Sequence, residues 1–400
     1  ATNHLAARRF GKVLDAVTIP RHMKDTVLYL DSAGFQIQNG FIAPEYLRDY
    51  AADYYHFIQT NADGLGYAFT LDLTPGTKVS VFSSAREMYE MNRVSLETAS
   101  ALPKDLRNKV LAVTQFRGPV LYATFRRLLF EEGRAARFQR FAVGGLAVSS
   151  RSSKPLPCFP YVIPLSDVLM HANARNMAEL HFHVLGNAER HDVLAHCLVE
   201  RHVRRKHGIR LRITHDSSTV FKKVTKERSV WLPDLVNHSF HDVNIASNHL
   251  YLVDPGHGSR INLVYQAINN ALLPYGLGPF SDAKHPLYEG SRATTLGNFL
   301  PMMLMLNVYA RLDEWCEEAA DALYPYYAAG QVGEFERGVA TTLLRLGARN
   351  SVEEAFVIAR ALTKSLDMLT SLDLDRCTYL VNRHLAAQEH PSIRRTPVYR

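Results

Sequence analysis

The sequence is poor in cysteine. Its 400 residues include only four, Cys158, Cys197, Cys316 and Cys377, and no two of them form a CxxC pair. Such isolated cysteines argue against a disulfide framework and against a zinc site built from thiolates. We therefore expect no disulfide scaffold and a reducing compartment, the cytoplasm.

Long apolar runs and nucleotide-binding glycine loops are also missing. No apolar stretch reaches the length of a membrane span, and residues 1–9 lack the apolar core of a signal peptide, so we expect no membrane partner. The chain contains neither GxGxxG nor a Walker loop, which argues against a Rossmann or P-loop nucleotide site.

Hydrophobic residues make up 47% of the chain, enough for a sizeable core. Lys and Arg number 46 against 39 Asp and Glu, a formal charge of +7. This modest basic excess is consistent with nucleic acid or a phosphorylated substrate but does not prove either.

A strand–helix unit recurs six times between residues 26 and 216. Each unit has a short apolar run, a polar or glycine end, a loop and a helical pattern. This order predicts an α/β fold, and a (β/α) barrel rather than an open sheet. The apolar runs are 27–31, 65–71, 110–114, 140–148, 180–185 and 209–214.

Periodicity does not settle residues 217–290, where strand-like and loop-like stretches alternate. From residue 291 the spacing becomes helical and ends in a basic tail. We expect a barrel over 1–290 and a helical region over 291–400, with helices at 292–311, 313–328, 331–347, 351–369 and 373–388.

Polar groups stand at the ends of the apolar runs: Asp31, Asp72, Gln115, Gly144-Gly145 and Asp216. In a barrel these ends meet at one mouth. Carboxylates and an amide over a glycine floor suit a guanine-type base, and two carboxylates can carry retaining glycosyl transfer. Taken singly, Asp31 and Asp216 could be helix caps and Asp72 a turn cap.

The same residues carry a resemblance to a known family. Leu30-Asp31-Ser32-Ala33-Gly34-Phe35-Gln36 resembles the DSGGFQ motif of the tRNA-guanine transglycosylases, and residues 141–148, FAVGGLAV, resemble their AVGGLAVGE motif. Weaker likenesses occur in the family's order: LDLTP at 71–75 to FDECTP, Gln115 to a strand-end glutamine, HVLGN at 183–187 to MGVG, and His215-Asp216 to the nucleophile strand FDCVLPTR.

The resemblance implies a base-exchange enzyme on a (β/α)8 barrel that flips a guanosine into its mouth. Asp216 corresponds to the nucleophile and Asp31 to the acid that deprotonates the incoming 7-deazaguanine. Asp72 is expected to bind the N1/N2 edge of the base, and Gln115 with the Gly145 N–H its O6. Further substrate-binding candidates are Ser32, Phe35, Gly144 and Leu146.

The sequence departs from the family in several places. The zinc motif CxCxxC is absent, so no cofactor is expected. Only 30 residues precede the first motif, and the nucleophile strand lacks its Cys and Pro-Thr-Arg. These losses favour the branch that exchanges guanine in DNA for a 7-deazaguanine such as preQ0, found in bacteria and phages, where the host cytoplasm is the compartment. A homodimer or helper proteins are possible partners.

Basic residues offer candidate phosphate contacts, although a solvated helix explains those in the run after residue 200 equally well. They are Arg201, Arg204, Arg205, Lys222 and Lys223.

Three alternatives stay open. The first is the same exchange on tRNA. The second is a metal-dependent TIM-barrel hydrolase using His181 and His183, which alternate on a strand and share a face, with Asp216 as a further ligand. The third is a non-catalytic nucleic-acid-binding relative.

Overall fold

The structure is a computed structural model that describes two compact units. The first unit comprises described residues within 1–187, 202–216 and 364–400, and the second those within 188–201 and 217–363. The expected boundary at residue 290 stays a prediction. The described residues are 2–3, 27, 29–32, 37, 42, 46–74, 85–116, 119–146, 158–186, 189–216, 229–234, 236–244, 251–253, 260–262, 291–349 and 351–372.

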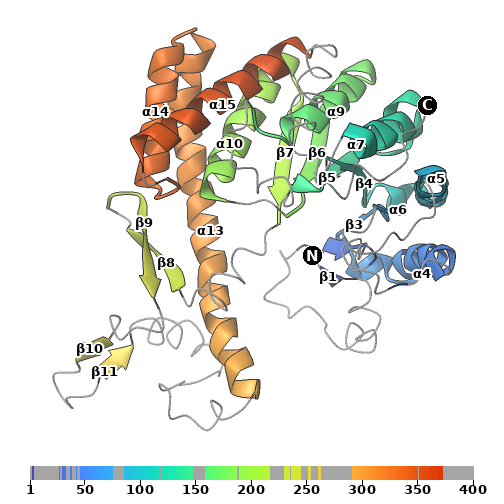
Figure 1. Cartoon of the computed structure of the whole chain (residues 1–400), viewed down its shortest axis with the longest axis horizontal. Coiled ribbons are helices and arrows are strands. Elements are labelled where there is room, and N and C mark those ends of the chain that lie inside the picture. Colours follow the sequence, from blue (N-terminus) through green and yellow to red (C-terminus); the bar gives the residue numbers. More distant parts are fainter. Residues whose placement is uncertain are drawn as a thin grey trace. The chain divides into compact units, whose positions relative to one another are not determined.

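The first unit is built on a parallel sheet whose seven strands lie in sequence order, β1 to β7. The sheet curls like half of a barrel (Figure 1). The α/β class is thus confirmed, whereas a closed eight-stranded barrel is not formed by the described strands and stays a prediction. The strands are β1 (Thr2–Asn3), β2 (Tyr29–Asp31), β3 (Tyr67–Phe69), β4 (Val110–Gln115), β5 (Arg140–Gly144), β6 (Glu179–Val184) and β7 (Arg210–His215).

Helices connect successive strands from β2 to β7, as the recurring pattern predicts. They are α4 (Leu47–Thr60), η3 (Ala62–Gly64), α5 (Ala85–Ser100), α6 (Lys104–Arg107), α7 (Pro119–Arg126), the π-helical η4 (Arg127–Glu131), η5 (Arg134–Arg137), α9 (Val162–Ala174) and α10 (Arg190–His207). Among the described residues, no helix has the length and apolarity that a membrane span requires.

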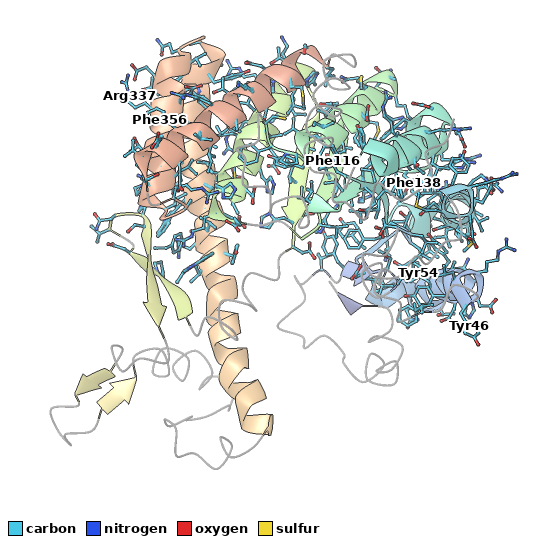
Figure 2. All side chains as sticks on the ribbon, in the orientation of Figure 1. Tyr46, Tyr54, Phe116, Phe138, Arg337 and Phe356 are labelled. Carbon is cyan, nitrogen blue, oxygen red and sulfur yellow. The ribbon has the colours of Figure 1, made fainter. Side chains whose placement is uncertain are left out.

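Helix α4 illustrates why these segments are helical. Its buried residues recur every three or four positions, so that one face is apolar. Tyr54 on that face is fully buried, whereas Tyr46, just before the helix, is largely exposed (Figure 2). The Tyr54 hydroxyl donates to the Phe69 carbonyl (2.5 Å), which ties α4 to strand β3.

The remaining described helices are α13 (Ser291–Ala328), α14 (Val332–Arg345) and α15 (Val352–Ser371). The break expected between residues 311 and 313 was wrong, because α13 is continuous. Val308, Leu312 and Trp315 are buried at helical spacing, and the intervening residues include no glycine or proline. The helix expected at 373–388 lies outside the described residues.

The second unit also contains two antiparallel hairpins. One pairs β8 (Ser229–Asp234) with β9 (Ser239–Asn244), and the other pairs β10 (Tyr251–Val253) with β11 (Arg260–Asn262). The first hairpin packs on α13 through aromatic rings: Trp231 lies 5.6 Å from Tyr309, and Phe240 lies 4.8 Å from Trp315, between ring centroids. Aromatic burial therefore anchors this hairpin.

Candidate active site

Strand parity brings most of the expected site residues to one face of the sheet. Residues paired across neighbouring strands share a face, and the row Val113, Ala142, His183, Thr214 is paired in that order. Gln115, Gly144 and Asp216 stand two residues further along three of these strands. They therefore lie on the same face, at the carboxyl edge of the sheet, where α/β proteins bind ligands.

Asp72 is the centre of the first polar cluster at this edge. The Ser32 hydroxyl donates to its Oδ1 (3.0 Å), and the Gln115 amide Nε2 donates to its Oδ2. Three residues from the ends of β2, β3 and β4 are thus joined by hydrogen bonds. All three are buried, so the cluster is preorganised rather than solvated.

Gly144 is needed for this arrangement. A Cβ at this position would run into the Gln115 side-chain amide. The glycine therefore lets Gln115 lie across the end of β5 and reach Asp72. Gly145 follows with a positive φ of 84°, a backbone conformation that side chains disfavour, and Leu146 is buried.

Helix α5 fixes the backbone on both sides of Asp72. Asn92 accepts from the Leu73 N–H (2.8 Å) and donates to the Leu73 carbonyl (2.7 Å). Ser95 donates to the Leu71 carbonyl (2.7 Å). These contacts satisfy buried backbone groups after β3 and leave Asp72 little freedom to move.

Burial raises the pKa of Asp72 to about 7, and the nearby negative charge of Asp31 raises it further, although the hydrogen bonds from Ser32 and Gln115 act in the opposite direction. Asp72 can therefore exist in either protonation state near neutral pH. The Gln115 Oε1 atom is buried and has no hydrogen-bond partner among the described residues. The acid and the amide satisfy each other only in part, which leaves capacity for a ligand with both donors and acceptors.

Asp216 follows β7 and is the more accessible carboxylate, with 39% of its side chain exposed. Its Oδ1 accepts from the Gly186 N–H (2.7 Å) and lies 3.6 Å from His183 Nε2. Burial acts to raise the pKa of Asp216, but the contacts with His183 and Gly186 outweigh it and lower the pKa. Asp216 is therefore ionised at neutral pH.

A histidine–threonine chain stands behind Asp216. The Thr214 hydroxyl contacts His183 Nδ1 (2.8 Å) and His181 Nε2 (2.7 Å). A hydroxyl can donate to only one of them, and the ionised Asp216 decides which, because His183 should present an N–H to it. Thr214 then donates to His183 Nδ1 and accepts from His181 Nε2–H. This chain fixes the tautomer of His183 beside the carboxylate.

Thr214 was not among the residues singled out from the sequence, although parallel register between β6 and β7 would have placed it beside both histidines. The expectation that His181 and His183 share a face is confirmed, since both contact one hydroxyl. Within the described part of the chain, no three His, Cys, Asp or Glu side chains come together as a metal site.

The candidate phosphate contacts differ in their surroundings. Arg201 is engaged within the protein, since it forms ion pairs with Asp321 (2.6 Å) and Glu317 (2.5 Å). Arg204 and Arg205 are exposed on the last turns of α10. Phe35, Lys222 and Lys223 lie outside the described residues.

Comparison with known proteins returns no relative. No family model, curated protein or solved structure matches the chain. The functional argument therefore depends on the site itself and on the sequence resemblance.

Proposed function

We propose that the protein is a base-exchange transglycosylase that replaces guanine in a nucleic acid, DNA in the first instance, with a 7-deazaguanine such as preQ0. One observation carries the proposal: a buried acid–amide pair, Asp72 and Gln115, lies at the same strand edge as an accessible, ionised carboxylate, Asp216. The resemblance of the motifs around Asp31 and Gly144-Gly145 points to the same reaction.

The acid–amide pair suits a guanine ring. An ionised Asp72 accepts from the N1 and N2 hydrogens, while the Gln115 Nε2 donates to O6, the groups that these two side chains otherwise offer each other. Binding of the base thus exchanges one set of hydrogen bonds for another. The same edge of a 7-deazaguanine is recognised, because the ring carbon that distinguishes it lies away from N1 and N2.

The reaction runs by double displacement. A carboxylate oxygen of Asp216 attacks the sugar C1′, the bond from C1′ to the base nitrogen breaks, and the base takes a proton from Asp31 as it leaves. Asp31 then removes the proton from the incoming base, whose nitrogen attacks C1′ and releases Asp216. Two inversions retain the anomeric configuration. The Gly186 N–H and the His183 side chain stabilise Asp216 as the anion, both before attack and on release.

Covalent trapping on a denaturing gel tests the proposal. The protein is incubated with labelled duplex DNA and, in parallel, with tRNA, with no incoming base, and the adduct is quantified. We expect a slow-migrating adduct with DNA that disappears on addition of preQ0 and is absent for Asp216→Asn. Asp105→Asn, which changes an exposed carboxylate on α6, is the matched control and should trap as the wild type does.

Adduct with tRNA alone would assign the exchange to tRNA. Binding without any adduct, from a wild-type protein shown to be folded, would contradict the transglycosylase and leave a non-catalytic nucleic-acid-binding protein. Loss of adduct in the Asp105→Asn control would show that the assay reports folding rather than the nucleophile.

A further inference from the structure

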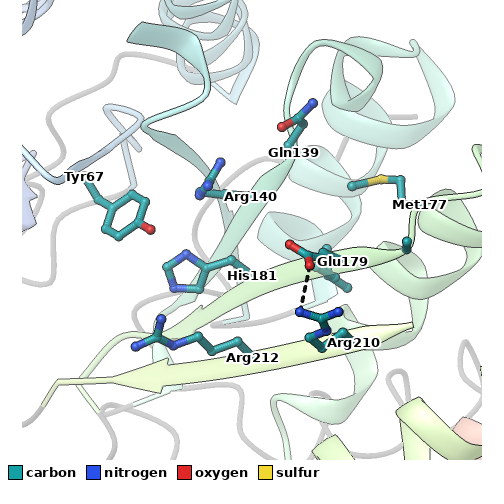
Figure 3. Close-up of a pocket in the computed structure, with 10 residues that line it drawn as sticks. Tyr67, Gln139, Arg140, Met177, Glu179, His181, Arg210 and Arg212 are labelled. Carbon is teal, nitrogen blue, oxygen red and sulfur yellow. Dashed lines mark ion pairs between the residues drawn. The ribbon is translucent and has the colours of Figure 1, made fainter. Parts of the chain in front are cut away.

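A second cavity lies at the opposite, amino-terminal end of the strands. It has a volume of about 480 Å³ and opens between the starts of β5, β6 and β7 (Figure 3). Tyr67, Arg140, His181 and Arg212 extend into its upper level, and Glu179 and Arg210 line the level below. None of these residues except His181 has a place in the proposed reaction.

The register explains why the basic residues converge. Arg140 is paired with His181, and His181 with Arg212, on three adjacent strands. Cross-strand partners point to the same side of a sheet, and neighbouring strands lie about 4.8 Å apart. Two guanidinium groups therefore stand on either side of one imidazole, within reach of a single ligand.

The level below is neutralised by the protein itself. Glu179 is the cross-strand partner of Arg210, and their side chains form an ion pair of 3.0 Å. At the level of His181 no such acid is supplied. Within the part of the chain that the structure describes, neither Arg140 nor Arg212 forms an ion pair with a carboxylate.

Arg140 is held in place but not satisfied. Its guanidinium lies over the Tyr67 ring, 5.2 Å from the centroid, and one of its terminal nitrogens donates to the Asn108 carbonyl. Its Nε is buried without a hydrogen-bond partner among the described residues. An unpaired buried guanidinium donor is costly, so a bound acceptor would be stabilising.

His181 limits the repulsion in this row. Burial, His183 and the two arginines lower its pKa to about 3, so the imidazole stays neutral between them. The cavity thus holds two uncompensated positive charges rather than three, which matches the charge of a phosphate monoester dianion.

We propose that this cavity is a phosphate-binding site in which Arg140 and Arg212 clamp one phosphate group. Guanidinium groups recognise phosphate oxygens through paired hydrogen bonds, and the fixed fork of Arg140 leaves Nε–H available for one of them. The phosphate belongs to a free nucleotide or to a nucleic-acid backbone, and the two sources share the chemistry that the site recognises. The site is separate from the Asp72 and Asp216 edge and does not depend on the proposed reaction.

Isothermal titration calorimetry of the full chain tests this site. The titrants are inorganic phosphate, deoxyadenosine 5′-monophosphate, and a short oligonucleotide without terminal phosphates. Binding of the mononucleotide but not of the oligonucleotide assigns the site to monoesters, and tighter binding of the oligonucleotide assigns it to the backbone. Arg212→Met, which keeps the length of the stem, should weaken binding by about tenfold or more. Arg48→Met, an exposed site on α4 with the same charge change, should leave it unchanged.

A second measurement does not rely on variants. Phenylglyoxal modifies accessible guanidinium groups, and peptide mass spectrometry reports which. Phosphate should protect Arg212 and Arg140 but not Arg48. No heat of binding from any titrant, or equal weakening by Arg212→Met and Arg48→Met, or unprotected arginines at saturating phosphate, would each overturn the proposal.

Discussion

Asp72 should destabilise the folded protein at neutral and alkaline pH. It is buried, and its carboxyl has a pKa raised from 3.8 to about 7 by burial and by Asp31. An acid whose pKa is raised on folding favours the folded state below its unfolded pKa, and that contribution is lost as pH rises through the folded pKa. The window for this loss therefore runs from about pH 4 to about pH 7.

The magnitude follows from the same values. At about 1.4 kcal/mol for each pKa unit, a rise from 3.8 to about 7 corresponds to a cost on the order of 4 kcal/mol once Asp72 is fully ionised. Asp72→Asn removes the charge but keeps an acceptor for Ser32. A rotation of the Gln115 amide lets its unpartnered Oε1 accept from the new amide. The substitution should therefore stabilise the protein above pH 7 while abolishing base recognition.

Urea denaturation followed by circular dichroism at pH 5, 6, 7 and 8 measures this effect. The advantage of Asp72→Asn over wild type should grow from pH 5 to pH 7 and level off by pH 8, and Asp105→Asn should show no such trend. A variant that is less stable than wild type by the same amount at every pH would refute the assignment of a raised pKa to Asp72.

Three further substitutions test other parts of the site. Gly144→Ala should displace the Gln115 amide and weaken binding of the base at little cost in stability, measured by base titration and thermal melting; unchanged affinity would count against the glycine's role. Thr214→Val removes the hydroxyl that orients His183 and should lower the rate of adduct formation more than it lowers nucleic-acid affinity, in stopped-flow and binding assays; an equal loss of both would indicate a general structural effect. Asn92→Ala leaves the Leu73 N–H and carbonyl unpaired and should cost about 2–4 kcal/mol of unfolding free energy in urea; a cost below 1 kcal/mol would contradict the clamp.

The alternation of apolar runs and helices predicted the parallel sheet well. Strand β4 was expected at 110–114 and spans Val110–Gln115, and α10 was expected at about 190–206 and spans Arg190–His207. Both depend on local apolar patterns that the fold does not override. The break near residue 312 was wrong, because a change in composition was taken for a helix end where no cap or breaker exists.

The strand-end residues could be proposed from sequence because parallel strands end at one edge. Their mutual contacts could not. The hydrogen bonds that join Ser32, Asp72 and Gln115 depend on register between strands some 40 residues apart in the chain. The support from Asn92 and Ser95 depends on which face of α5 meets the sheet. Such details follow from packing, which a single sequence does not specify.

The measurement closest to the central claim is the mass of the peptide that contains Asp216. After incubation of the wild-type protein with guanine-containing DNA, nuclease trimming and proteolysis, that peptide should carry a deoxyribose-containing adduct. The adduct should be lost when preQ0 is added before quenching. An unmodified Asp216 peptide, recovered quantitatively from protein that has released guanine from DNA, would contradict Asp216 as the nucleophile.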